Sequence, residues 1–130
     1  MSTRAQIRFA TREEGVSFSE HPNAIHAQFY VHHDGYPEGL GLHIASSIVK
    51  SGSATSFYGE IESLDAYHGD LEYIYYVWQA PEKSTWISIF KVDGKFCEYS
   101  DKYFETTECI FVGEPSNLIN KYKLNTNANG

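Results

Sequence analysis

The sequence has few of the residues that build disulfide frameworks, metal centres or membrane spans. Its 130 residues include only two cysteines, Cys97 and Cys109, and they do not form a CxxC pair. No segment approaches the ~20 apolar residues of a transmembrane helix, and Arg4, Arg8 and Arg12 interrupt any apolar run near the N-terminus. We therefore expect reduced, structural cysteines and a cytoplasmic protein without a signal peptide or a membrane span.

Known catalytic and phosphate-binding motifs are also missing. There is no G-x-S-x-G elbow around a nucleophilic serine, and neither cysteine has a recognisable local signature. Gly35, Gly39 and Gly41 do not match a P-loop or a dinucleotide fingerprint. The sequence thus assigns no catalytic residue, no metal ligand and no cofactor, and it favours binding over catalysis.

Positive charge is scarce, and the imbalance is local. The net charge is −7, of which residues 60–114 carry −8, from twelve acidic and four basic side chains. Such a segment repels phosphates, so we expect no direct contact with nucleic acid. The same segment is suited to contact a basic protein. The alternative interpretation is a solvated acidic surface.

Aromatic residues, by contrast, are plentiful at 15% of the chain, and ten of them are tyrosines. A tyrosine has an apolar ring and a polar tip, which suits pockets and interfaces. This content predicts a homo-oligomer.

The hydrophobic pattern predicts an α+β fold in one domain over residues 1–124, with a disordered tail over 125–130. Residues 4–11 and 25–33 alternate like strands, and a helix is expected from Pro37 to Lys50. Residues 71–79, 85–92, 95–99 and 109–112 are strand-like, with a hairpin at Asp93-Gly94 and one helical turn after Pro115. Residues 54–70 are ambiguous and contain a possible short helix over 61–67. The expected architecture is a β-β-α unit followed by an antiparallel meander, in one sheet packed on one main helix.

The segment Tyr30–Gly39 holds the highest density of reactive side chains, including His32, His33 and Asp34. Strand alternation directs the two histidines to opposite faces, with His32 toward Arg4 and Arg8 and His33 toward the core or the helix, which argues against a metal site. Only His33, Asp34 and His43 are candidates to converge. We interpret the segment first as a rigid strand-to-helix turn and second as the rim of a pocket.

A polar sheet face is the best candidate site. If the first two strands pair, the polar side chains of both lie on one face. These are Arg4, Gln6 and Arg8 on the first strand and His26, Gln28, Tyr30 and His32 on the second. Two guanidinium groups with amides, imidazoles and a phenol suit a small anion, and aromatic residues of 73–78 or 86–90 are available to stack on a base. The competing interpretation is a solvent-exposed sheet face. The predicted ligand-binding residues are Arg4, Arg8, Gln28, Tyr30, His32, Asp34 and Tyr36.

Two sequence patterns carry a family resemblance. The opening Ser-Thr-Arg-Ala-Gln-Ile (residues 2–7) and the later Tyr-x-His-x-Asp-Gly-Tyr-Pro-x-Gly (residues 30–39) resemble small accessory proteins encoded by phages and prophages. The resemblance covers roughly the first 45 residues. It implies a small protein of the host cell cytoplasm that counters host defence, and it carries no catalytic residue over.

Within that setting the sequence leaves three hypotheses. The first is a protein that binds and sequesters a nucleotide-like immune signalling molecule. The second is an acidic inhibitor of a host nuclease or CRISPR complex, of the anti-CRISPR type. The third is a small enzyme that cleaves a signalling nucleotide with His33, Asp34 or His43.

Overall fold

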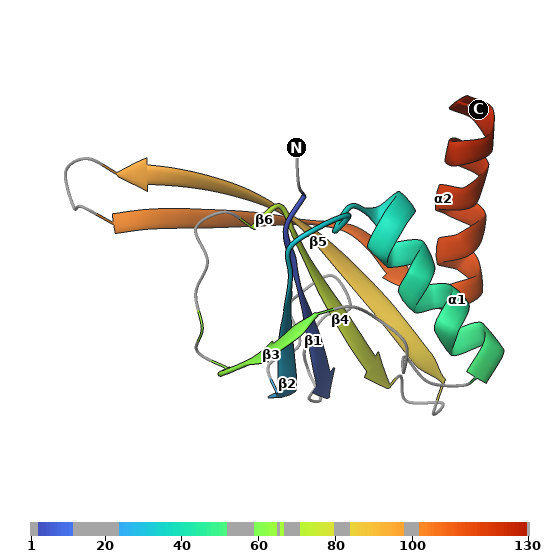
Figure 1. Cartoon of the computed structure of the whole chain (residues 1–130), viewed down its shortest axis with the longest axis horizontal. Helices are drawn as coiled ribbons and strands as arrows, with labels where there is room; N and C mark the ends of the chain where they lie inside the picture. Colours follow the sequence, from blue (N-terminus) through green and yellow to red (C-terminus); the bar gives the residue numbers. More distant parts are fainter. Residues whose placement is uncertain are drawn as a thin grey trace.

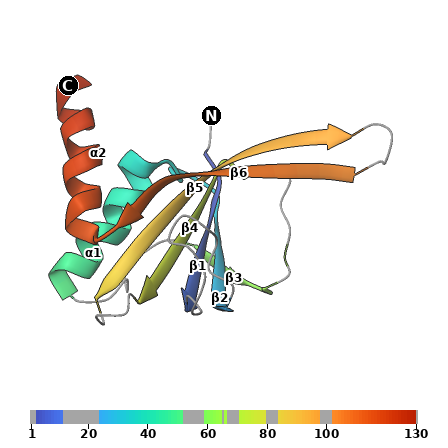
Figure 2. The same ribbon diagram turned by 180° about the vertical axis from the view of Figure 1, so that it is seen from behind.

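The computed structural model describes residues 3–11, 24–51, 59–64, 66, 71–79, 84–97 and 102–129. They form one six-stranded sheet with two helices on one of its faces (Figures 1 and 2). The elements in chain order are β1 (Ala5–Thr11), β2 (Ala24–Val31), the π-helical turn η1 (Pro37–Gly41), α1 (Leu42–Ser51), β3 (Glu60–Glu62), β4 (Tyr73–Gln79), β5 (Thr85–Cys97), β6 (Lys102–Gly113) and α2 (Pro115–Asn129). Among the described helices, none has the length and apolar character needed to cross a membrane.

The sheet is mixed, with the strand order β3-β2-β1-β4-β5-β6. β1 pairs with β2 in antiparallel orientation and with β4 in parallel orientation, while β4, β5 and β6 are antiparallel neighbours. A parallel pair needs a long crossover, and here the chain between β1 and β4 includes β2, α1 and β3. The α+β class and the single sheet are as predicted. The sheet as a whole is not a simple meander.

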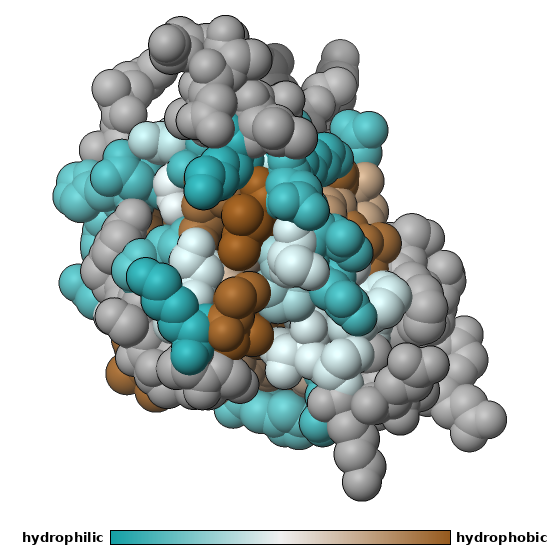
Figure 3. Space-filling model, turned by 90° about the vertical axis from the view of Figure 1, so that its right-hand side faces the viewer, coloured by the Kyte–Doolittle hydropathy of each residue, from teal (hydrophilic) through white to brown (hydrophobic). Residues whose placement is uncertain are grey.

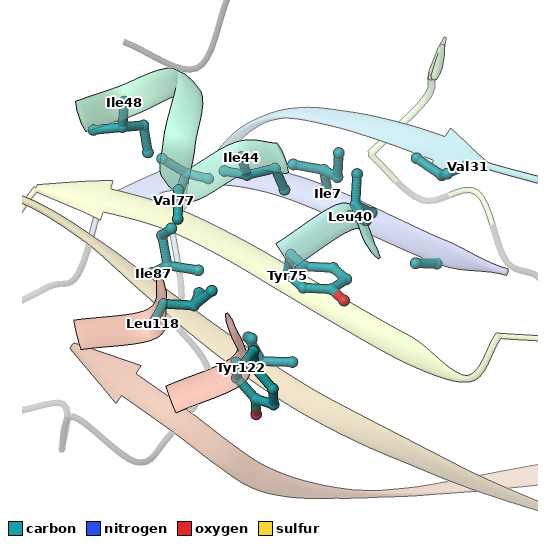
Figure 4. Packing of buried hydrophobic residues seen from close by; sticks show 13 residues of the cluster. Ile7, Val31, Leu40, Ile44, Ile48, Tyr75, Val77, Ile87, Leu118 and Tyr122 are labelled. Atoms are coloured by element: carbon teal, nitrogen blue, oxygen red, sulfur yellow. The ribbon is translucent and has the colours of Figure 1, made fainter. Parts of the chain in front are cut away.

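The main core lies between the sheet and the two helices (Figure 4). Ile7 of β1 and Val77 of β4 point from the sheet toward Ile44 of α1, while Leu118 and Tyr122 approach from α2. All five side chains are buried, as the alternation of the strands and the helical spacing of the apolar residues require. The prediction of one main helix is wrong, because α2 also covers this face of the sheet.

Three local predictions also fail. The expected hairpin at Asp93-Gly94 is absent, because both residues continue β5 and pair with Thr106 and Glu105 of β6. The possible short helix over 61–67 does not begin at Ile61, because Glu60–Glu62 pairs with β2 as an edge strand; residues 65 and 67 lie outside the described part of the chain. α2 is longer than the predicted turn and runs to Asn129. In each case pairing or packing with a segment distant in the sequence overrides the local signal. The domain bounds stay a prediction.

The turn between β2 and η1 packs closely against the start of β1. Asp34 has a left-handed backbone, with φ of 55°. The Gly35 amide donates to the Thr3 carbonyl at 2.9 Å, and the Tyr75 hydroxyl donates to the Gly35 carbonyl. A Cβ on Gly35 would lie 2.8 Å from the Cβ of Ala5. The turn is therefore architectural, as predicted, because its glycine permits this close approach.

We expect Gly35→Ala to lower the free energy of unfolding by about 1–3 kcal/mol, because the added methyl overpacks the contact with β1. Urea denaturation followed by tryptophan fluorescence measures the change. Gly41→Ala is the matched control, since its Cβ would meet the nearest side chain, Tyr75, at an ordinary 3.5 Å. An equal loss of stability in both variants would contradict the role assigned to Gly35.

Candidate ligand-binding site

The face of the sheet opposite the two helices, here called the far face, is buried rather than solvated. It carries a second hydrophobic cluster, which includes Tyr76 of β4 and Phe90 of β5. Polar side chains are also buried there: Gln6 is 1% exposed, and Gln28 and Ser88 are fully buried. The sequence-based interpretation of this face as an exposed polar surface is therefore wrong. The cluster comprises Ala10, Tyr30, Leu71, Ile74, Tyr76, Trp78, Phe90 and Val92.

An amide network joins β1, β2 and β3 on the far face. The Gln6 Nε2 donates to Glu62 Oε1 at 2.8 Å, and the Gln28 Nε2 donates to the same oxygen at 3.0 Å. Both amide nitrogens also lie 3.4 Å from the Ala66 carbonyl. Gln6 and Gln28 are side by side because they occupy adjacent positions across the β1–β2 ladder, where Arg8 pairs with Gln28 and Gln6 with Tyr30.

Arg8 extends this network toward the centre of the sheet. Its Nη1 donates to the Tyr76 hydroxyl at 2.6 Å, and its Nη2 donates to the Gln6 Oε1 at 2.9 Å. The guanidinium also lies 5.5 Å from the centroid of the Tyr76 ring. Among the described residues, Arg8 has no carboxylate partner, since Gln6 stands between it and Glu62. The guanidinium is thus held by neutral groups.

Two polar atoms of the network are buried without a hydrogen-bond partner, namely Arg8 Nε and Gln28 Oε1. A buried polar group left unpaired costs about 1–3 kcal/mol. One atom is a donor and the other an acceptor, and their residues are directly paired on neighbouring strands. The site can therefore still donate a hydrogen bond from Arg8 Nε and accept one at Gln28 Oε1.

Aromatic side chains flank the network on β4 and β5. Trp78 and Trp86 have ring centroids 5.5 Å apart, and the Trp78 indole donates to the Ser88 hydroxyl at 2.8 Å. The Tyr76 ring meets Phe90 edge to face at 5.5 Å. Alternation places these residues on the far face. The expected aromatic residues beside the polar groups are therefore present in the fold.

Burial raises the pKa of the Tyr76 hydroxyl above its ordinary value, and the nearby charge and hydrogen bond of Arg8 oppose this shift. Burial dominates, so Tyr76 is neutral at physiological pH and accepts the Arg8 hydrogen bond through its oxygen.

The structure unites only part of the predicted site. Arg8, Gln28 and Tyr30 lie on the far face, with Tyr30 6% exposed. His32 is at its edge: its ring lies 4.5 Å from that of Tyr30 and its Nε2 is 3.4 Å from Glu60 Oε1. Arg4 is partly buried at the start of β1, and its carbonyl accepts from the Glu72 amide at 2.9 Å.

Asp34 and Tyr36 belong to the turn, and both are exposed. No contact among the described residues joins either of them to the amide network. The residue missing from the predicted set is Gln6, which bridges Arg8 and Glu62. Its position between Arg4 and Arg8 in the strand alternation was the available signal.

The histidines do not form a metal centre in the described parts of the chain, where no group of three or more His, Cys, Asp or Glu side chains is placed to hold an ion. The expected division of His32 and His33 between two faces is wrong. β2 ends at Val31, so alternation no longer applies, and both rings are exposed with centroids 6.3 Å apart. Cys109 forms no disulfide, and its thiol donates to the Phe111 carbonyl at 3.6 Å.

Comparisons with protein-family models, with curated proteins and with solved structures gave no match. The function is therefore argued from the geometry of the far face and from the sequence.

We expect Tyr76→Phe to lower the free energy of unfolding by about 1–3 kcal/mol at neutral pH, because Arg8 loses its buried acceptor. The folded-state pKa of Tyr76 is raised above 10.0. Its contribution is therefore complete below pH 10 and is lost as the pH rises through the raised pKa. The variant cannot ionise at this position, so its stability should fall less steeply in that range.

Chemical denaturation at neutral pH and above pH 10 provides the measurement. Tyr36→Phe is the matched control because Tyr36 is 38% exposed, and its effect should lie within about 0.5 kcal/mol. Identical alkaline stability profiles for the original chain and Tyr76→Phe would refute the expected coupling.

Proposed function

We propose that the protein is a phage-encoded counter-defence protein that binds and sequesters a small, anionic, nucleotide-like signalling molecule on the far face. The phage setting rests on the resemblance of residues 2–7 and 30–39. The ligand class rests on the Arg8 network and its aromatic neighbours. We propose sequestration rather than cleavage because the side chains of the network are suited to hold a ligand through hydrogen bonds, and none of them is assigned a catalytic role.

The observation that carries the proposal is the state of Arg8. Arg8 is partly buried, and a guanidinium that is partly withdrawn from water is normally paired with a carboxylate or phosphate. Here its described partners are the neutral Tyr76 hydroxyl and the Gln6 amide, and its Nε is buried and unpaired. An anionic group would supply the missing charge, and the planar guanidinium is well suited to bind a phosphate oxygen.

The neighbouring groups favour a nucleotide over a simple anion. Gln28 Oε1 offers an acceptor for a base or a ribose hydroxyl. Trp86 is partly buried beside Trp78, and an indole is a good surface for stacking a base. Access to these groups requires the covering main chain at Ser63 and Ala66 to move, since their carbonyls contact Gln28.

The other two hypotheses stay predictions. A basic host protein would meet exposed carboxylates such as Glu60, Glu72, Glu108 and Glu114. Glu62 is not part of such an array because its carboxylate accepts two amides on the far face. An enzyme would need a general base, and the described hydrogen-bond partners of Arg8 are the neutral Tyr76 hydroxyl and Gln6 amide.

The test is a thermal-shift and calorimetric titration with adenosine 5′-diphosphate, a cyclic dinucleotide and inorganic phosphate as probes. At least one nucleotide should raise Tm and be recovered unchanged after the protein is denatured. Arg8→Ala should weaken its binding roughly ten- to hundredfold, the range of a hydrogen bond to a charged group. Phosphate should bind more weakly because it cannot stack.

Lys91→Ala is the matched control, since it removes an exposed cation from β5 without touching the network. The affinity of the Lys91→Ala variant for the nucleotide should equal that of the original chain. Recovery of a chemically altered nucleotide would favour the enzyme. The acidic inhibitor would instead show no response to nucleotides and salt-sensitive binding to a protein. Equal affinity of Arg8→Ala and the original chain would remove Arg8 from the site.

A further inference from the structure

Strands β5 and β6 extend well beyond the rest of the sheet. The pairing of β5 with β4 ends at Lys91, which lies opposite Tyr73. The pairing of β5 with β6 continues from there to Cys97 and Lys102. The segments Val92–Cys97 and Lys102–Thr107 therefore form a two-stranded arm of roughly 20 Å at the usual rise per residue.

The arm leaves the body on the side opposite the helices, as Figures 1 and 2 agree. A register shift between Ile89 and Phe90 marks a bulge at its base, where Ile110 is the extra residue of β6. Bulges bend the strands that contain them. No described strand or helix packs along the arm. An isolated two-stranded ribbon is marginally stable in water, so an arm of this length needs a further contact.

The two edges of the sheet differ in how they are protected. β3 is only three residues long, which is a usual way to limit pairing at an edge. β6 is twelve residues long and contains no proline. Near the body, Lys121 Nζ donates to the Ile110 carbonyl at 2.9 Å and so occupies this part of the edge. No described element does the same along the arm, from Lys102 to Thr106.

We infer that the arm is a self-association surface, and that β6 of one copy pairs with β6 of a second copy in antiparallel orientation about a two-fold axis. The second copy is the favoured occupant because an antiparallel edge is complementary to itself, so both arms gain a third strand from one contact. Residues 102–107 are rich in strand-forming types, as Lys-Tyr-Phe-Glu-Thr-Thr. Lys121 confines the pairing to the arm.

The helix side, as far as its residues are described, does not present this combination. Figure 3 views the helix side, where hydrophobic surface forms a narrow strip between hydrophilic patches. Val49 is 58% exposed beside a shallow hollow between the end of α1 and the start of α2. Nothing on that side indicates what would cover it. The arm, in contrast, has a strand edge over Lys102–Thr106 that no described element covers, and such an edge specifies the geometry of its partner.

The experiment compares the full chain with a shortened-arm variant in which residues 94–105 are replaced by Asn-Gly. Asp93 and Thr106 are direct cross-strand partners, so this two-residue turn can close the ladder between them. Light scattering during size-exclusion chromatography should give the mass of two chains for the original and of one chain for the variant. Amide exchange over Lys102–Thr106 should become faster on dilution of the original chain.

Ile61→Lys is the control at the opposite edge, where Ile61 is 74% exposed on β3. This variant should remain a dimer. A cooperative unfolding transition detected by tryptophan fluorescence shows that the shortened variant is folded, since Trp78 and Trp86 lie outside the arm. If the shortened variant does not fold, the substitutions Phe104→Asp and Thr106→Asp in the full-length arm replace it, and each should give the mass of one chain. A monomeric original chain, a dimeric folded arm variant, or a dimer lost only in Ile61→Lys would each overturn the inference.

Discussion

The parallel pairing of β1 with β4 is the constraint on which the rest of the molecule depends. It places β1 between β2 and β4 near the middle of the sheet, where it is covered on both sides. Ile7 then points to the helices and Gln6 to the far face, and each side chain is buried in its own environment. The same strand therefore supports the main core and the candidate site. A change in the register of β1 would therefore disrupt both the main core and the candidate site.

This double burial explains why the far face is so richly bonded. A polar residue on a buried strand needs an internal partner, because water no longer provides one. The amide nitrogens of Gln6 and Gln28 meet this requirement through Glu62, which β3 brings to the edge of the sheet. Arg8 Nε and Gln28 Oε1 do not meet it. Buried polar atoms without a hydrogen-bond partner are uncommon in proteins, and these two atoms are therefore the reason to propose that a ligand binds beside Arg8.

The helix face was predictable to a large degree, and the far face was not. Alternation in residues 4–11 and the helical spacing of Leu40, Ile44, Ile48 and Val49 are local signals. They predicted the part of the main core between β1 and α1, except that Val49 is exposed. The far face depends on β3 and β4, which are distant in sequence from β1. Local patterns suggested which side chains share that face, but not that it is buried or that Gln6 connects Arg8 with a carboxylate.

Local sequence patterns were sufficient to predict β1, β2, β4, the first part of β5, the helix after Pro37, the tight turn at Gly35 and the acidic character of the chain, because these follow from the period of apolar residues and from residue chemistry. The tertiary structure alone decided the parallel β1–β4 pair, the continuation of β5 through Asp93-Gly94 and the exposure of both His32 and His33. Each of these depends on which distant segment supplies hydrogen bonds to a strand and on where that pairing ends.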